Sequence, residues 1–110
     1  MKLEVLYFDG CPTYVAATRT LREVLSELGV EAEVEMVAAN TDEEAKRLRF
    51  PGSPTIRVDG RDLFPVKERE EWLLGCRVYA TPEGLRGSPT TEMVREALRE
   101  EGKAHAGLPR

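Results

Sequence analysis

The order of hydrophobic and polar positions predicts a strand, a helix and a second strand in the first third of the chain. Residues 2–8 are almost continuously apolar and stop at Asp9, as expected of a strand buried on both faces. Over residues 14–28, apolar side chains recur every three or four positions, which predicts a helix with one buried face. Residues 31–37 alternate between glutamate and apolar residues and predict a strand with one solvated face. Short connections make these elements a parallel βαβ unit.

A short helix and a hairpin are predicted next. Thr41 is followed three residues later by Glu44, a capping box that predicts a helix starting directly after Thr41. A β-branched run over residues 55–58 then leads into Asp59-Gly60, a strong two-residue turn signal. Residues 61–64 would form the antiparallel return strand.

The last part of the chain has weaker periodicity. Residues 65–87 predict a long loop with a turn of helix and a short extended piece, which is typical of functional segments. Ser88 and Pro89 predict the cap and first position of a last helix. We therefore expect one domain over residues 1–102 and a mobile tail over 103–110. The expected order is β-α-β-α-β-β-α, an α/β fold whose mixed four-stranded sheet is flanked by helices.

Composition and charge narrow the class of protein. The 110 residues suit a single domain, and 41% hydrophobic with 33% charged residues argues against disorder. A net charge of −4 argues against a dedicated nucleic-acid binder. The chain shows neither the roughly 20-residue apolar run of a membrane helix nor an apolar N-terminal signal segment. We expect a cytoplasmic protein without a membrane partner or a cofactor, and the single histidine, His105, argues against a histidine-built metal site.

Most of the candidate chemistry lies in two cysteines, and Cys11 has the more informative position. Cys11 follows the predicted buried strand and precedes Pro12, a residue suited to the first position of a helix. The start of a helix offers unpaired N–H groups and the positive end of its dipole. These would lower the pKa of the thiol and make Cys11 a nucleophile near neutral pH. The alternative role is that of a small buried residue beneath the sheet.

Pro54, between Ser53 and Thr55, is the second informative position. Proline cannot donate to a β-ladder and belongs at a strand start or an edge. It is either an ordinary trans proline or a cis proline that leaves the neighbouring backbone edge free to pair with an incoming peptide or thiol compound. Residues of this segment, together with Pro12 and Tyr14, are therefore candidates for substrate binding. Tyr14 itself is expected chiefly to pack, although its hydroxyl could donate a hydrogen bond to the thiolate.

The element order, with Cys11-Pro12-Thr13-Tyr14 and Ser53-Pro54-Thr55 at these places, resembles the thioredoxin/glutaredoxin family over roughly residues 2–101. In that family the first cysteine of Cys-x-x-Cys is the nucleophile, and a cis-proline packs beside it. The resemblance implies that Cys11 is the nucleophile and Pro54 the cis-proline. Tyr14 stands in place of the second cysteine. The implied activity is thiol–disulfide exchange with protein or low-molecular-weight thiols and disulfides, through a single N-terminal active-site cysteine.

Residues 5–12, 49–55 and 76–79 more narrowly resemble small bacterial thioredoxin-like proteins labelled alkylmercury-lyase-like. Organomercurial lyases use two cysteines and an aspartate, which implies a pair made of Cys11 and Cys76. Cys76 would then either resolve a mixed disulfide on Cys11 or act as the second ligand of a soft metal ion. Two other hypotheses stay open, namely that Cys76 is a buried packing residue and that the whole domain is a non-catalytic interaction module.

Overall fold

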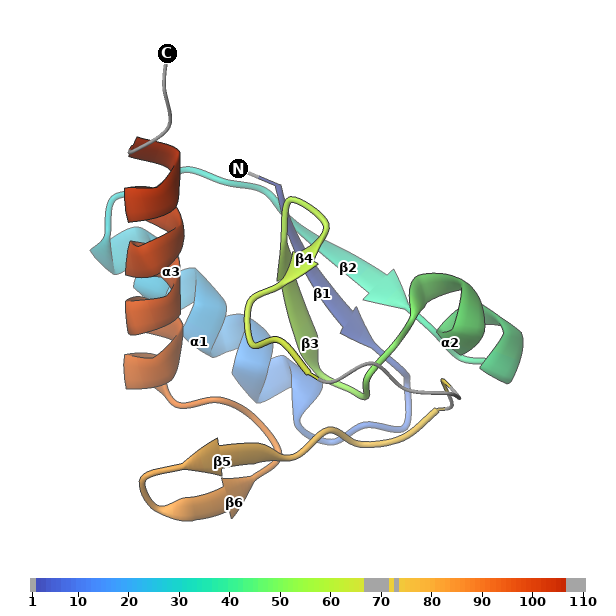
Figure 1. The fold of residues 1–110 in the computed structure, drawn as a ribbon. Coiled ribbons are helices and arrows are strands. Elements are labelled where there is room, and N and C mark those ends of the chain that lie inside the picture. Colours follow the sequence, from blue (N-terminus) through green and yellow to red (C-terminus); the bar gives the residue numbers. More distant parts are fainter. Residues whose placement is uncertain (1, 67–71, 73, 107–110) are drawn as a thin grey trace.

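A mixed four-stranded sheet forms the centre of the molecule (Figure 1). The computed structural model describes residues 2–66, 72 and 74–106 of the chain. The strand order is β2-β1-β3-β4, with β1 parallel to β2 and antiparallel to β3. The strands are β1 (Leu3–Tyr7), β2 (Val34–Ala38), β3 (Thr55–Val58) and β4 (Arg61–Asp62). The predicted α/β architecture with a parallel first half and a hairpin second half is confirmed.

Helices cover both faces of this sheet. The helices are α1 (Tyr14–Glu27), α2 (Asp42–Leu48) and α3 (Thr91–Ala106). As Figure 1 shows, α1 and α3 lie on one face and α2 on the other. Among the described residues, no helix combines the length and the apolar character needed to cross a bilayer.

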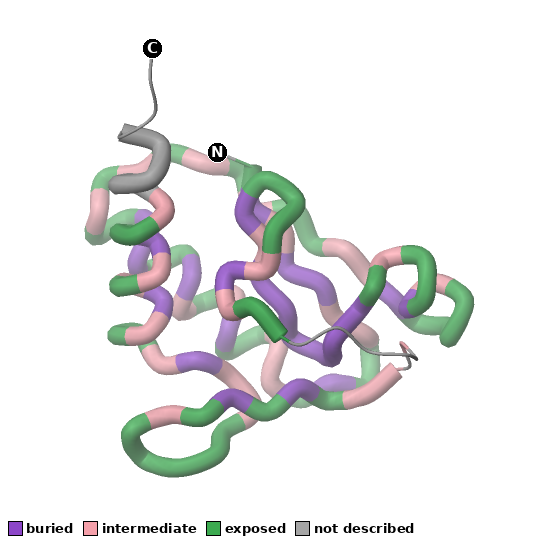
Figure 2. The backbone as a smooth tube through the Cα atoms, viewed as in Figure 1, coloured by how far each residue is buried: buried purple, intermediate pink, exposed green. Residues whose placement is uncertain are grey.

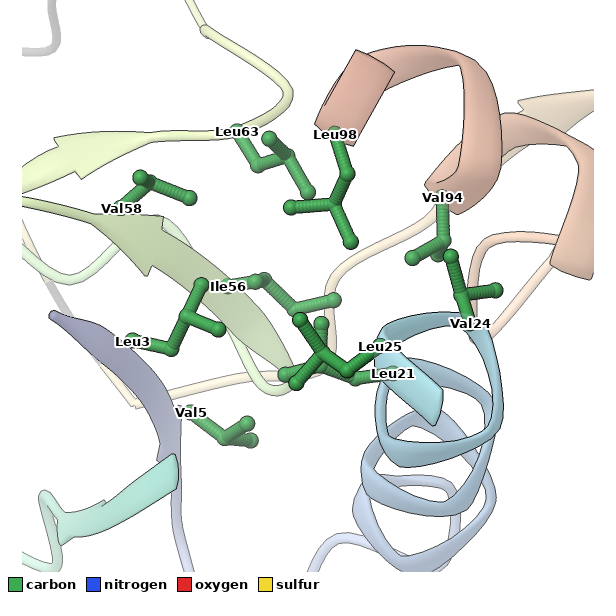
Figure 3. Packing of buried hydrophobic residues seen from close by; sticks show 10 residues of the cluster. All are labelled: Leu3, Val5, Leu21, Val24, Leu25, Ile56, Val58, Leu63, Val94 and Leu98. Atoms are coloured by element: carbon green, nitrogen blue, oxygen red, sulfur yellow. The ribbon is translucent and has the colours of Figure 1, made fainter. Parts of the chain in front are cut away.

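The larger part of the core lies between the sheet and the pair α1–α3, and its aliphatic side chains interlock there (Figure 3). Its buried members are Leu3, Val5, Leu21, Val24, Leu25, Ile56, Val58, Leu63, Val94 and Leu98. On the opposite face, Leu6 joins a smaller cluster beneath α2 with Ala39, Ala45 and Phe50. Leu3 and Val5 of β1 are buried in the larger cluster and Leu6 in the smaller one, so β1 is covered on both faces, in agreement with its almost continuous apolar sequence. Figure 2 shows how burial is distributed along the backbone.

The starts of the first two helices differ in how well local sequence predicts them. α2 begins as predicted, because the Glu44 N–H donates to the Thr41 hydroxyl at 3.1 Å. α1 begins at Tyr14, with Thr13 as its N-cap, and not at Pro12. The reason is a tight turn in which the Cys11 N–H donates to the Phe8 carbonyl at 3.0 Å, so the helix can start only after the turn is complete.

α3 differs from the prediction at both ends. Its capping hydroxyl belongs to Thr90, which accepts the backbone N–H three residues later at 3.1 Å, and not to Ser88. The helix also continues through Gly102 to residue 106, beyond the end expected at residue 102. Alanine and lysine in that segment favour helix enough to offset one glycine. The rest of the predicted tail, residues 107–110, lies outside the described residues.

The predicted long loop contains a second, small sheet. Strands β5 (Tyr79–Thr81) and β6 (Gly84–Arg86) form an antiparallel hairpin at one end of the molecule (Figure 1). Just before it, residues 74–78, called the strap below, cross the end of the main sheet. There Cys76 and Ser53 form an isolated parallel β-bridge.

Arg77 fastens the strap to the main sheet. Its side chain is only 6% exposed and donates to the Thr55 hydroxyl at 3.2 Å, the Asp62 carboxylate at 2.9 Å and the Phe64 carbonyl. The hydroxyl of Tyr79 adds a hydrogen bond to the Pro54 carbonyl at 2.6 Å. A buried cation is tolerated when it is paired and hydrogen-bonded in this way.

Gly52 makes room for this docking. Its φ of +126° lies in a region that side-chain-bearing residues rarely adopt. A Cβ atom at Gly52 would lie 2.9 Å from the Arg77 Cβ and 3.0 Å from its backbone N. The strap can therefore approach residues 52–53 closely only because glycine occupies this position.

We predict that Gly52→Ala lowers the free energy of unfolding by about 2–3 kcal/mol, through backbone strain and the collision with Arg77. Gly75→Ala is the matched control within the strap, because a Cβ there meets no atom within 4 Å. The control should change the free energy by less than about 1 kcal/mol. Urea denaturation of both variants measures the difference, and equal effects would contradict a tight contact at Gly52.

Candidate functional site

Cys11 lies in the turn between β1 and α1, three residues before the helix begins. Its side chain is 3% exposed. Although the residue is not in the helix, the backbone N–H groups of Thr13 and Tyr14 act on its sulfur and lower the pKa of the thiol. The unpaired donors expected at the start of α1 therefore reach the thiol from one side.

The surroundings of Cys11 favour the thiolate form. Burial raises the pKa of the Cys11 thiol, but the nearby hydroxyls of Ser53 and Thr13 and the backbone N–H groups of Thr13 and Tyr14 lower it by more. The net effect is a pKa below the ordinary value of a cysteine. A thiol with a lowered pKa in a polar niche is typical of a reactive cysteine.

The two hydroxyls beside the sulfur are not equivalent. The Thr13 hydroxyl lies 3.4 Å from the Cys11 sulfur and donates its single proton to the Gly87 carbonyl at 2.9 Å. The Ser53 hydroxyl is fully buried and has no hydrogen-bond partner of ordinary geometry among the described residues. Because an unused buried donor is costly, Ser53 is the hydroxyl whose proton is available to a thiolate at Cys11.

Other predicted site residues have mainly structural contacts. The Tyr14 ring stacks on Tyr7, with centroids 4.4 Å apart, so it contributes its backbone N–H to the sulfur and its ring to packing. Pro12 is exposed beside Cys11. Thr55 is buried, donates to the Gly52 carbonyl at 2.6 Å and accepts from the strap, which leaves it unavailable to a substrate.

The Ser53–Pro54 bond is cis, but the hypothesis that the neighbouring backbone edge is free is wrong. The Ser53 N–H donates to the Gly75 carbonyl at 2.9 Å, and the Ser53 carbonyl accepts the Arg77 N–H at 2.9 Å. The strap thus occupies both backbone groups that an incoming peptide would use. The sequence does not reveal this arrangement, because a single bridge between segments far apart along the chain leaves no periodic pattern.

Both cysteines lie next to Ser53. Cys11 approaches the side chain of Ser53, and Cys76 is paired with its backbone. Both thiols are free, Cys11 buried and Cys76 exposed, so Cys76 is not the buried packing residue considered from the sequence. Sequence reasoning missed Arg77, whose one signal is a charge inside the otherwise apolar run of residues 76–79.

We predict that Ser53→Ala raises the pKa of the Cys11 thiol, because it removes the buried hydroxyl whose proton is uncommitted. In a Cys76→Ser background Cys11 is the sole thiol, and its alkylation rate by iodoacetamide across pH reports its ionisation. The midpoint of that curve should lie below the value for a free cysteine and should move to higher pH in Ser53→Ala.

Thr13→Val is the matched control, since the Thr13 proton is already donated to Gly87. It should move the midpoint less than Ser53→Ala does. A larger shift in Thr13→Val would overturn the assignment of Ser53 as the principal donor.

Comparison of the chain with protein-family models, curated protein sequences and solved structures finds no match. Within the part of the chain that the structure describes, no three or more histidine, cysteine or acidic side chains gather in a way that could hold a metal ion.

Proposed function

We propose that this protein is a thioredoxin-like thiol–disulfide oxidoreductase in which Cys11 is the attacking thiol. The observation that carries the proposal is the proximity of the Cys11 sulfur, whose pKa is lowered, to the fully buried Ser53 hydroxyl, which has no hydrogen-bond partner of ordinary geometry among the described residues. A hydroxyl in this position can donate its proton to the sulfur once the sulfur is ionised. Its position therefore supports a site organised for thiolate chemistry.

The arrangement of elements supports the same proposal. The strand order β2-β1-β3-β4, with α1 and α3 on one face, agrees with the fold that the family resemblance implies. Cys11 lies between β1 and α1, and Pro54 directly precedes β3. These are the two places that the resemblance implies for the nucleophile and the proline.

The proposed reaction begins with attack of the Cys11 thiolate on one sulfur of a substrate disulfide. A bond forms between the Cys11 sulfur and that sulfur, and the other substrate sulfur leaves as a thiolate that takes up a proton. The same donors that stabilise the Cys11 thiolate also make Cys11 a good leaving group. The mixed disulfide is therefore readily attacked again, which is what an exchange enzyme needs.

Occupation of the Ser53 edge bears on the substrate class. An extended polypeptide cannot add as a strand beside Ser53 while the strap holds both backbone groups. The burial of Cys11 further favours a small disulfide that can reach its sulfur. We therefore favour compact disulfides, either low-molecular-weight compounds or exposed protein loops, over extended chains.

Cys11→Ser should abolish the fast reaction of the reduced protein with an aromatic disulfide reagent at neutral pH. Cys76→Ser should retain that fast phase, because the first attack belongs to Cys11. Release of the coloured thiolate, followed by stopped flow, measures both variants. Wild-type protein unfolded in urea is the reference, and its slower reaction would show that the fold activates the sulfur.

A Cys11→Ser variant that reacts as fast as the wild type would overturn the proposed function. So would a wild-type protein that reacts no faster folded than unfolded.

A further inference from the structure

We infer that Cys76 is a resolving thiol carried by the strap, which closes a disulfide with Cys11 after Cys11 has taken up a substrate sulfur. This inference rests on the proposed function, because it concerns the step that follows attack by Cys11. The juxtaposition that carries it is the parallel bridge between Cys76 and Ser53, the residue whose side chain adjoins the Cys11 sulfur.

The bridge determines where the Cys76 side chain begins. Residues paired across a parallel bridge project their side chains from the same face, and the two backbones lie about 4.8 Å apart. The Ser53 side chain adjoins the Cys11 sulfur, so Cys76 projects from that same face beside it. A disulfide needs Cα atoms about 4.4–6.8 Å apart, a spacing that a movement of the strap toward Cys11 can supply.

The strap is fastened unevenly around Cys76. After Cys76, Arg77 is buried and makes three side-chain hydrogen bonds. Before Cys76, the Gly75 carbonyl accepts the Ser53 N–H at 2.9 Å, Gly75 has open space where a Cβ would be, and the Leu74 N–H makes a long hydrogen bond of 3.4 Å to the Asp42 carboxylate. Cys76 therefore lies between the buried Arg77 and a glycine that one backbone hydrogen bond holds to Ser53. Opening of that bond would let Cys76 move while Arg77 keeps the strap docked.

The two thiols differ in the way that the two steps require. Cys11 is buried among donors and makes the first attack, whereas Cys76 is exposed at the surface and follows. In the second step the Cys76 thiolate attacks the Cys11 sulfur of the mixed disulfide. A Cys11–Cys76 bond forms, the substrate sulfur leaves as a thiolate and is protonated, and the low-molecular-weight disulfide has been reduced to two thiols.

The experiment treats the reduced protein with oxidised glutathione and follows its intact mass and peptide map with time. Wild-type protein should pass through a glutathione adduct and end with a Cys11–Cys76 link and the loss of two hydrogens. Cys76→Ser should stop at a stable adduct on Cys11. The double variant Cys76→Ser, Ala80→Cys is the matched control, since it keeps two thiols but places the second outside the bridge at an exposed position.

The outcomes separate this inference from the proposed function. A stable Cys11 adduct in wild type, with no link to Cys76, would overturn the inference and leave the proposed function intact. Closure in the Ala80→Cys control at the wild-type rate would also overturn it, because the bridge would then be irrelevant. Absence of any adduct on Cys11, including in Cys76→Ser, would instead remove the proposed function.

Discussion

The buried guanidinium of Arg77 is the interaction on which the geometry of the site depends. It joins the strap to β3 through Thr55 and to the end of β4 through Asp62, and it also lies over the Tyr79 ring at 4.6 Å. Burial raises the pKa of Asp62, and the charge of Arg77 opposes that effect. Removing one partner of such a pair costs about 3–5 kcal/mol, because the other charge stays buried without compensation. The strap therefore stays docked as long as this pair is intact.

Docking of the strap divides the polar groups of Ser53 between two neighbours. Its N–H and carbonyl are satisfied by Gly75 and Arg77, while its hydroxyl stays beside Cys11. One residue thus links the backbone of the strap to the ionisation of the buried sulfur. Cys76 of the strap is bridged to the backbone of Ser53, and the Ser53 side chain lies beside Cys11. A small movement of the strap would therefore change the surroundings of the Cys11 sulfur.

Local signals in the sequence predicted most of the fold but only part of the site. The apolar run of β1 and the Thr41 cap depend on nearby residues, so their patterns are readable along the chain. The start of α1 was misplaced because the turn that ends at Cys11 delays it. The strap could not be predicted, because a single bridge has no period. Arginine is rarely buried unless it is paired, so the sequence alone does not predict that Arg77 is buried.

The strap belongs to the same chain as the sheet end that it covers, so its hold on Ser53 does not depend on protein concentration. A tethered segment acts at an effective concentration in the millimolar range, which a strand from another molecule must exceed to displace it. Unpaired backbone groups at a sheet margin are a template for strand exchange and aggregation. By pairing Ser53 internally, the chain protects the sheet margin beside Cys11 from recruiting a second copy.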